Sequence, residues 1–361
     1  MSAARTFDTG HSDLIHDCAF DFYGKRVATC SSDRLIKVYE AGEGGEAEGV
    51  PSATLKGHDG PVFQVAWAHP QFGTLLASCG YDKRVIVFRE AAPGNWVQVY
   101  CYEGHQSSGA RPPSPHARLA HPPHPPAPAP PGPPGPPLSP LPPPSVNSIS
   151  WAPPEAGLHL ACASSDGHVT VHSHQEGADT WAVTTLQDCP AGVTSVSWAP
   201  CQPSERGADG ASTALYLATA GCDGRARVHK LRRAGGERVG GGAWAAEGAP
   251  RELVYDGAAA PGVAWLRDVA WCPSALGEAA GLPGLVLAAG GDDQLVTLWS
   301  RVGADWSSKH LPRFPSPVWR LSWNTTGSLL AVSCGDNTVT LWKEELDGQW
   351  CQVSNVPLER S

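Results

Sequence analysis

Residues 331–342 read AVSCGDNTVTLW, and residues 288–299 read AAGGDDQLVTLW. Both segments begin with small side chains, pass through an aspartate and end in an alternating run that closes on tryptophan. Four earlier segments, at 28–39, 77–88, 161–172 and 218–229, follow the same pattern. In each segment an aspartate precedes the closing aromatic or histidine residue by six positions: Asp33, Asp82, Asp166, Asp223, Asp293 and Asp336. A constant spacing that recurs six times indicates a repeat architecture.

A second apolar stretch precedes each aspartate and also ends on an aromatic side chain. These aromatic residues are Phe20, Trp67, Trp151, Trp198, Trp271 and Trp323. Downstream, a glycine-containing turn often leads to another tryptophan, at Trp96, Trp181, Trp306 and Trp350. Each unit therefore supplies four antiparallel strands, which is one propeller blade. We predict an all-β fold, a six-bladed WD-repeat β-propeller that forms a single domain over residues 1–361.

Composition agrees with many short strands joined by tight turns. Glycine (40 residues) and proline (35) are abundant, there are 14 tryptophans, and methionine occurs once. The 11 cysteines include no CxxC pair, and several lie in apolar strand-like runs. We therefore expect free, buried thiols in a reducing compartment rather than disulfides.

Charge and motifs exclude several classes of function. A net charge of −9 argues against direct binding to nucleic acid and against unaided docking on anionic lipid. No secretory signal and no membrane-spanning run is expected. The sequence contains no GxSxG, P-loop, HExxH or cofactor fingerprint, so we predict neither an enzyme nor a cofactor. The carboxylate pair at 292–293 occupies the turn position of the repeat, where turn chemistry is the default interpretation.

A Gly-His pair lies ten residues before the strand aromatic in the first two units and, with an interruption, in the third. We expect the ring of each histidine to bond the turn aspartate of its own blade. The histidines are His11, His58 and His105, with Asp33, Asp82 and Asp166 as their partners. A catalytic dyad is the alternative, but a scaffold bond recurs in a repeat whereas an active site does not.

The third unit contains a proline-rich interruption. Removing 37 residues, 109–145, restores the spacing of ten between the Gly-His pair and its aromatic. We interpret 109–145 as a disordered insertion in the loop that enters blade 3, because its composition cannot build a core. A ligand for SH3 or WW domains, a solvated loop without a partner and a gene-model artefact all remain open. Three histidines in it, His116, His121 and His124, lack a cysteine partner, so we expect no metal site.

Several long blocks resemble one family closely, including LIHDCAFDFYGKRVATCSSDR, VAWAHPQFG and GDNTVTLWKEELDGQW. They are similar to the Sec-thirteen family, the propeller subunit of the outer COPII vesicle coat that is shared with the nuclear pore Y complex. The resemblance covers nearly the whole chain outside the insertion and is weakest at about residues 201–260. It implies an open propeller that a partner chain completes with a seventh blade.

The resemblance also implies partners and locations. The expected partners are the large α-solenoid COPII coat subunit, the solenoid nucleoporin of the Y complex and the subunits of a nutrient-signalling complex of the TOR pathway. The expected locations are the cytoplasmic face of the endoplasmic reticulum and its vesicles, the nuclear pore and the lysosomal surface. Contact with membranes would be made only through the coat.

The ends of the chain agree with an open ring. We expect the last repeat to supply its own final strand around Trp350 and Gln352, which leaves an N-terminal strand around Thr6 and Phe7 without a pairing strand. Unpaired edges invite strand addition, so these four residues are the candidate edge for a partner blade. Two rivals stay open: the sister nucleoporin propeller, and a peptide receptor that would need clustered arginines such as Arg267 and Arg320.

Overall fold

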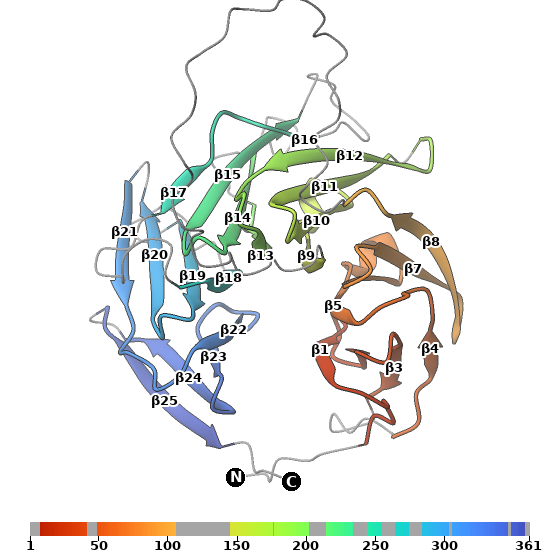
Figure 1. Ribbon diagram of the computed structural model, residues 1–361, viewed down its shortest axis with the longest axis horizontal. Helices are drawn as coiled ribbons and strands as arrows, with labels where there is room; N and C mark the ends of the chain where they lie inside the picture. The colour runs from red at the N-terminus through yellow and green to blue at the C-terminus, as the bar shows by residue number, and fades with distance from the viewer. Residues whose placement is uncertain are drawn as a thin grey trace, which may run out of the picture.

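The computed structural model describes most of the chain. The described residues are 8–41, 49–105, 145–175, 177–201, 214–233, 244–253, 264–273, 284–302, 305–345 and 348–357. They form six antiparallel sheets arranged as blades around a central axis (Figure 1). The prediction of an all-β, six-bladed propeller is confirmed.

Each blade is built from strands that follow one another in the chain, with the first strand nearest the axis and the last on the perimeter (Figure 1). Blades 1 to 3 consist of β1 (Ile15–Phe20), β2 (Arg26–Ser31), β3 (Ile36–Glu40) and β4 (Ala53–Leu55); β5 (Val62–Trp67), β6 (Leu75–Gly80), β7 (Val85–Ala92) and β8 (Asn95–Tyr102); and β9 (Val146–Trp151), β10 (His159–Ser164), β11 (His168–Gln175) and β12 (Thr180–Gln187).

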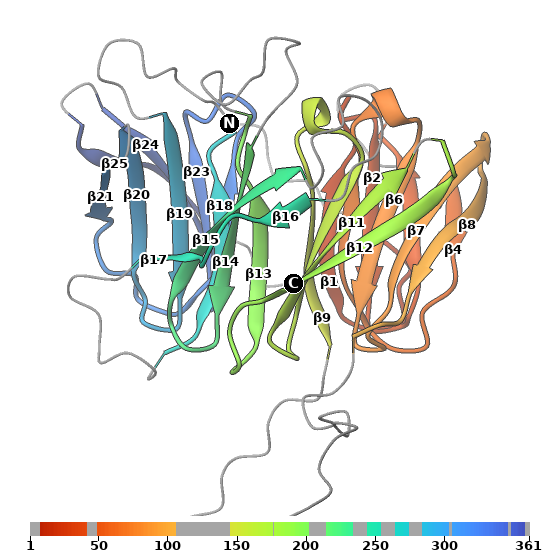
Figure 2. The same ribbon diagram turned by 90° about the horizontal axis from the view of Figure 1, so that it is seen from above.

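Blades 4 to 6 follow the same order. They consist of β13 (Val193–Trp198), β14 (Ala214–Gly221), β15 (Ala226–Arg233), β16 (Trp244–Ala246) and β17 (Arg251–Leu253); β18 (Leu266–Trp271), β19 (Leu285–Gly291), β20 (Val296–Val302) and β21 (Asp305–His310); and β22 (Val318–Trp323), β23 (Leu330–Cys334), β24 (Thr338–Glu344) and β25 (Trp350–Pro357). Two short 3-10 turns, η1 (Pro70–Phe72) and η2 (Pro154–Ala156), lie at the same end of the ring (Figure 2).

The repeated aspartate shapes the turn between the second and third strands of every blade. One carboxylate oxygen accepts the backbone N–H of the residue two positions later, at 2.9 Å from His168 in blade 3 and 3.2 Å from Leu295 in blade 5. The same bond occurs in the other four blades. The intervening residue has a positive φ, such as 63° at Asn337, which explains why glycine or asparagine often stands there.

The hydrophobic core lies between the blades. Five clusters of buried side chains each join one blade to the next, from the pair formed by blades 1 and 2 to the pair formed by blades 5 and 6. Small residues such as Ala28, Ala77 and Ala161 are fully buried in them, so neighbouring sheets can approach closely. Among the described residues no such cluster joins blade 6 to blade 1.

Blade 4 departs from the four-strand pattern that the repeat predicts for every blade. The outer strand is broken into β16 and β17, and both pieces pair with β15. Gly248, with a φ of 78°, and Pro250, which has no N–H to donate, interrupt the ladder between the two pieces. Trp244 in β16 anchors this edge, because it is fully buried and its indole N–H donates to His159 of blade 3 at 2.9 Å.

The proline-rich segment lies outside the described residues except at its last position. Ser145 is buried, its Oγ lies 2.9 Å from the Oγ of Ser165, and its carbonyl oxygen accepts the N–H of Ser165. Ser145 therefore belongs to blade 3, where it leads directly into β9.

The burial of Trp244 predicts a large loss of stability on truncation. The Trp244→Ala variant should lower the free energy of unfolding by about 3–5 kcal/mol, because it opens a cavity and leaves the His159 acceptor without its donor. Chemical denaturation measures this change. The matched control is Trp265→Ala, at a side chain that is 40% exposed, and equal losses in the two variants would contradict the packing described for blade 4.

Candidate functional site

Side chains of the inner strands bond each blade to the next. Three positions before its closing aromatic residue, each of the first five inner strands carries a side-chain oxygen that accepts a backbone N–H of the following blade. The bonds run from Val65 to Asp17 (3.3 Å), Ile149 to Gln64 (2.7 Å), Val196 to Ser148 (3.3 Å), Val269 to Ser195 (3.4 Å) and Leu321 to Asp268 (2.8 Å). The residue type varies, but an acceptor is present at all five junctions.

The tryptophans that close the inner strands form a second series of bonds in the reverse direction. Each indole N–H donates to a carbonyl oxygen of the preceding blade. The pairs are Trp67 with Ala19, Trp151 with Ala66, Trp198 with Ser150 and Trp323 with Ala270, at 3.0–3.1 Å. Trp271 is the exception, since its buried indole N–H has no partner among the described residues.

The junction between blades 6 and 1 breaks both series. Arg320 stands where the other inner strands carry an acceptor, and a guanidinium cannot accept a hydrogen bond. Phe20 stands where the other blades carry tryptophan, and it has no N–H to donate. In place of these bonds, Nη2 of Arg320 lies 3.5 Å from Oδ1 of Asp17 across the junction.

Arg320 lies between two carboxylates at the centre of the ring. Burial raises the pKa of Asp17 and of Asp268 above the ordinary value, and the positive charge of Arg320 opposes this shift. Burial also disfavours the charge on Arg320, but Asp268 and Asp17 outweigh it and raise the pKa of the guanidinium. The side chain keeps 40% of its surface accessible because it projects into the central channel. The pair is therefore partly solvated and weaker than an enclosed ion pair.

Large apolar side chains are exposed beside this junction. In blade 1 they are Leu14 (71% exposed), Ile15 (46%), Phe20 (60%), Phe22 (65%) and Tyr23 (65%). The aromatic residue in the place of Phe20 is only 6% exposed in blade 4 (Trp198) and 5% exposed in blade 5 (Trp271), where a preceding blade covers it. Several large exposed apolar side chains on one blade mark an interaction surface, which we call the apolar strip of blade 1.

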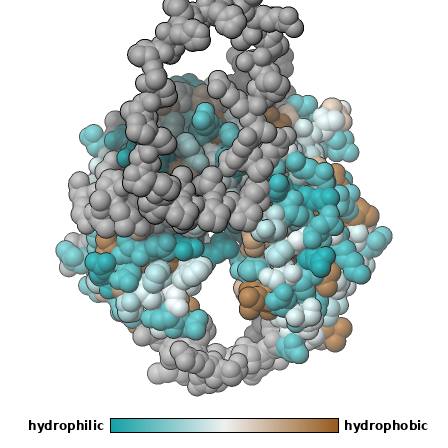
Figure 3. Space-filling view, in the orientation of Figure 1, coloured by the Kyte–Doolittle hydropathy of each residue, from teal (hydrophilic) through white to brown (hydrophobic). Residues whose placement is uncertain are grey.

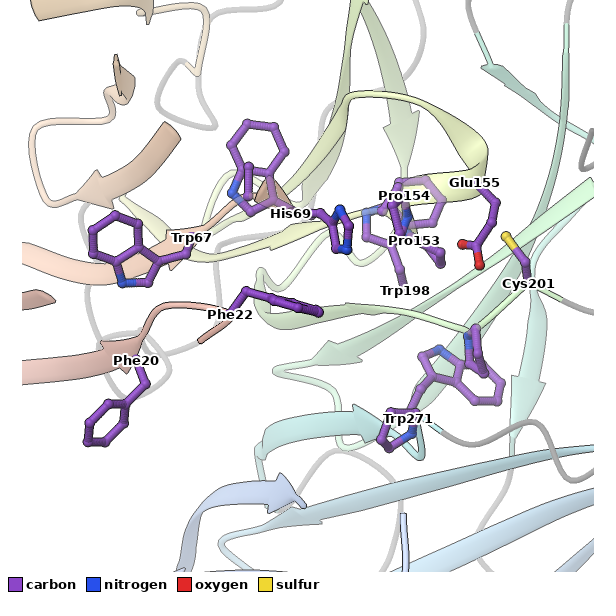
Figure 4. Close-up of a pocket in the computed structure, with 15 residues that line it drawn as sticks. Phe20, Phe22, Trp67, His69, Pro153, Pro154, Glu155, Trp198, Cys201 and Trp271 are labelled. Carbon is purple, nitrogen blue, oxygen red and sulfur yellow. The ribbon is translucent and has the colours of Figure 1, made fainter. Parts of the chain in front are cut away.

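The strip continues into a cavity of about 600 Å³ at the mouth where the inner strands end. Figure 4 shows Phe20 and Phe22 on one side, Trp67 and His69 from blade 2 beside them, and Trp271 of blade 5 across the opening. Five of the six aromatic residues that close the inner strands, all but Trp323, thus line this mouth.

The predicted partner edge is described in part. Trp350 and Gln352 lie in β25, which pairs with β24 and forms the outer edge of blade 6. Trp350 packs edge to face against Trp323 at 5.8 Å, whereas Gln352 is exposed. Thr6 and Phe7 lie outside the described residues. Blade 6 therefore completes its own sheet, as the sequence suggested, and β25 has a free edge in the part of the chain described.

The three predicted histidine–aspartate pairs are present. Nδ1 of His11, His58 and His105 lies 2.8, 3.0 and 2.9 Å from the carboxylates of Asp33, Asp82 and Asp166. Nε2 of each ring contacts a hydroxyl in the same blade, from Thr29, Ser78 and Thr170 respectively.

The turn aspartates of these blades are ionised under ordinary conditions. Burial acts to raise the pKa of Asp82, but the hydrogen bond from His58 and the backbone N–H groups of Asp59 and Arg84 outweigh burial and lower it. Both ring nitrogens of His58 are engaged and its side chain is 1% exposed, so the pair holds the turn and faces no open site.

The other three turn aspartates have different partners. Asp223 bonds Arg227, which also lies near Asp188 of the same blade. Asp293 holds its own turn, and Asp336 is exposed and bonds Thr338. Blades 4 to 6 lack the histidine that bonds the turn aspartate in blades 1 to 3, so their turn aspartates have other hydrogen-bond partners.

The described residues were also compared with the requirements of a metal site and of a membrane-spanning helix. No group of three or more metal-ligating side chains occurs there, and no helix in this part of the chain is long and apolar enough to cross a membrane. All eleven cysteines are free thiols.

Comparison with known proteins identifies the family. The WD domain, G-beta repeat, matches residues 2–40, 49–89 and 308–343, which include strands of blades 1, 2, 5 and 6. "Protein SEC13 homolog" of Drosophila melanogaster is 36% identical over 98% of this chain and 84% of its own length. This chain belongs to the SEC13 family. "Protein transport protein SEC13" of Mycosarcoma maydis is 37% identical over 99% of this chain and 96% of its own length, and that of Emericella nidulans is 35% identical over 99% of both.

In this SEC13-family chain, the repeats contain a signal for the loss of both hydrogen-bond series at Arg320 and Phe20, but the predictions made from the sequence did not include that loss. Aligning the six inner strands would have shown an acceptor three positions before five of the aromatics and an arginine before the sixth. From the sequence alone Arg320 is a candidate only for a receptor function, because its pairing with Asp17 depends on the ring that the fold forms.

The histidine pairs predict a selective loss of stability. His58→Ala should lower the free energy of unfolding by about 1–3 kcal/mol, because it removes one buried hydrogen bond from Asp82 and one from Ser78. His174→Ala is the control, since its partner Asp179 is 84% exposed, and its loss should stay below about 1 kcal/mol. Thermal unfolding of both variants tests this, and equal losses would contradict it.

The ion pair between Arg320 and Asp17 predicts that replacing Arg320 changes the pH dependence of folding stability. In the Arg320→Gln variant Asp17 and Asp268 lose their cation, so their pKa values rise further above those of the unfolded chain. Carboxylates with a raised pKa bind protons more tightly in the folded state, so stability should increase as the pH falls from 7 through the raised pKa values of these two carboxylates. At pH 7 we expect a loss of about 1–3 kcal/mol relative to wild type.

Urea denaturation at several pH values measures this effect. Arg89→Gln, at an exposed arginine of blade 2, should leave the pH profile unchanged. If the stability of Arg320→Gln changed with pH in parallel with that of wild type, the guanidinium would not control the pKa values of Asp17 and Asp268.

Proposed function

We propose that this chain is a structural subunit of a protein-transport coat and that a partner chain supplies a seventh blade between blades 6 and 1. The names of two relatives, which call them protein transport proteins, support the transport role. The observation that carries the mechanism is the broken junction, where Arg320 and Phe20 replace the acceptor and the donor found elsewhere in the ring.

A partner blade would meet a surface suited to it. Ile15 and Phe20 present apolar surface on blade 1, and burying each side chain fully contributes about 1.5–3 kcal/mol. A sheet inserted there would take the place that a preceding blade takes at the other five junctions. Packing against the face of blade 1 accounts for these exposed residues, and pairing with the free edge of β25 would add to it.

The resemblance to the COPII propeller subunit suggests the partners. We propose the large α-solenoid coat subunit as the principal one, which places the protein at the cytoplasmic face of the endoplasmic reticulum and on its vesicles. Association with the solenoid nucleoporin of the Y complex and with a nutrient-signalling complex would use the same junction, at the nuclear pore and at the lysosomal surface. The role is that of a scaffold and not of an enzyme.

Co-purification with the solenoid coat subunit tests the proposal. Phe20→Glu should weaken the complex at least about a hundredfold, because it places a charge in an apolar contact. Val99→Glu in β8 is the matched control, since Val99 is 39% exposed and lies on the perimeter of blade 2. Light scattering would show whether each variant is folded and monomeric.

Two results would overturn the proposal. One is undiminished binding by the Phe20→Glu variant. The other is undiminished binding when proline substitutions break the strands of the partner's own blade, because a solenoid that docks elsewhere needs no such strands.

A further inference from the structure

The junction between blades 6 and 1 opens into a second cavity, of about 460 Å³, at the mouth where the inner strands begin. Figure 3 shows an opening between these two blades in the described part of the ring, with hydrophobic surface on the side of blade 1. Trp319 and Arg320 of blade 6 line the cavity from one side, and His16 of blade 1 lines it from the other. A blade inserted at the junction would therefore present side chains to this cavity, and the charges in the lining restrict what those side chains can be.

Two of the charged side chains in the lining are already satisfied. Asp268 is buried, and its carboxylate oxygens accept hydrogen bonds from the hydroxyl of Ser195 at 2.6 Å and from the backbone N–H of Leu321 at 2.8 Å. Arg267 donates from Nε and Nη2 to the two carboxylate oxygens of Asp292, at 2.7 and 3.2 Å. Neither side chain has a strong unmet need for a partner of opposite charge.

Arg320 is the charged side chain of the lining that can still bind a partner. Its side chain is 40% accessible, and among the described residues its guanidinium donates no hydrogen bond. The carboxylate that faces it is that of Asp17, with Nη2 and Oδ1 separated by 3.5 Å. The N–H donors of a guanidinium form a planar fork that matches the two oxygens of a carboxylate. Arg320 therefore has room for a second, more closely bound acceptor.

A blade that packs at the junction must satisfy this donor. At the other five junctions the inner strand offers an acceptor and the next blade supplies an N–H, whereas Arg320 offers donors and requires an acceptor from the next blade. Asp17 serves only in part, because its Oδ2 already accepts the N–H of Val65 at 3.3 Å. An inserted sheet with only apolar side chains would remove Arg320 from water without a full set of hydrogen bonds, which is strongly unfavourable.

We propose that the partner blade carries an aspartate or glutamate on the strand that faces blade 6, and that its carboxylate pairs with Arg320 in this cavity. The inference rests on the proposed function, since it names the chemistry by which the junction recognises that blade. The neighbouring side chains of the partner strand should be apolar, because Trp319 of blade 6 is 51% exposed and Ile15 of blade 1 is 46% exposed. One carboxylate in an otherwise apolar strand is thus the expected pattern.

Calorimetric titration of the whole protein with the solenoid coat subunit tests the charge requirement. Arg320→Gln should weaken binding at least about tenfold and Arg320→Glu at least about a hundredfold, because they leave the partner carboxylate unpaired or opposed. Arg320→Lys keeps the charge and should retain more affinity than Arg320→Gln. Arg89→Gln is the matched control at an exposed arginine of blade 2, and it should change the affinity less than about twofold.

A charge exchange separates pairing from a purely structural role of Arg320. The acidic residues of the partner blade are replaced by lysine one at a time, and one of these variants should bind Arg320→Glu at least about tenfold more tightly than the unmodified partner does. If Arg320→Glu is poorly folded, the salt dependence of binding gives the same information. Added salt should weaken binding less in Arg320→Gln than in wild type, because one charge pair is already lost.

The outcomes distinguish this proposal from the proposed function. If Phe20→Glu abolishes binding and the Arg320 variants bind as wild type does, the junction stands and the carboxylate is excluded. Weakened binding by the Arg320 variants without rescue by any lysine variant, or with unchanged salt dependence where rescue cannot be measured, would also overturn the pairing. Undiminished binding by Phe20→Glu would remove the partner blade from the junction, and this proposal with it.

Discussion

The structure depends on a hydrogen bond between the side chain of one inner strand and a backbone N–H of the next blade. A blade of four strands has two faces and cannot bury both alone, so its stability comes from its neighbours. The bond sets the stagger between neighbours, and the apolar clusters then fill the space between the sheets. Asp17, Gln64, Ser148, Ser195 and Asp268 perform this one task with three different residue types.

The same need for a hydrogen bond between neighbouring blades explains why the junction at Arg320 is different. A ring that closed on itself would need an acceptor in blade 6 and a donor in blade 1, and this chain has a cation and a phenyl ring there. The ion pair with Asp17 joins the two blades at the axis, while the apolar face of blade 1 stays exposed further out. This combination joins the two blades at the axis and leaves apolar surface exposed on blade 1, where the proposed partner blade would pack.

The sequence predicted the blades because their determinants are local. The turn aspartate, the positive φ after it and the alternation of the strands all lie within twelve residues, so six repeats located the blades. The His11, His58 and His105 pairs were predictable for the same reason. The role of Arg320 was not, because Asp17 lies about 300 positions away and only the ring brings the two together. The broken outer strand of blade 4 was also missed, since Gly248 and Pro250 acquire their meaning only beside β15.

Hydrogen–deuterium exchange of the chain alone and mixed with the proposed solenoid partner tests the central claim most directly. If a partner blade occupies the sixth junction, exchange should slow in β1 and in β23 and β24, while β10 and β14, enclosed by their own neighbours, should change little. Protection confined to other blades, with unchanged exchange in β1, β23 and β24, would contradict the account of an unfinished ring.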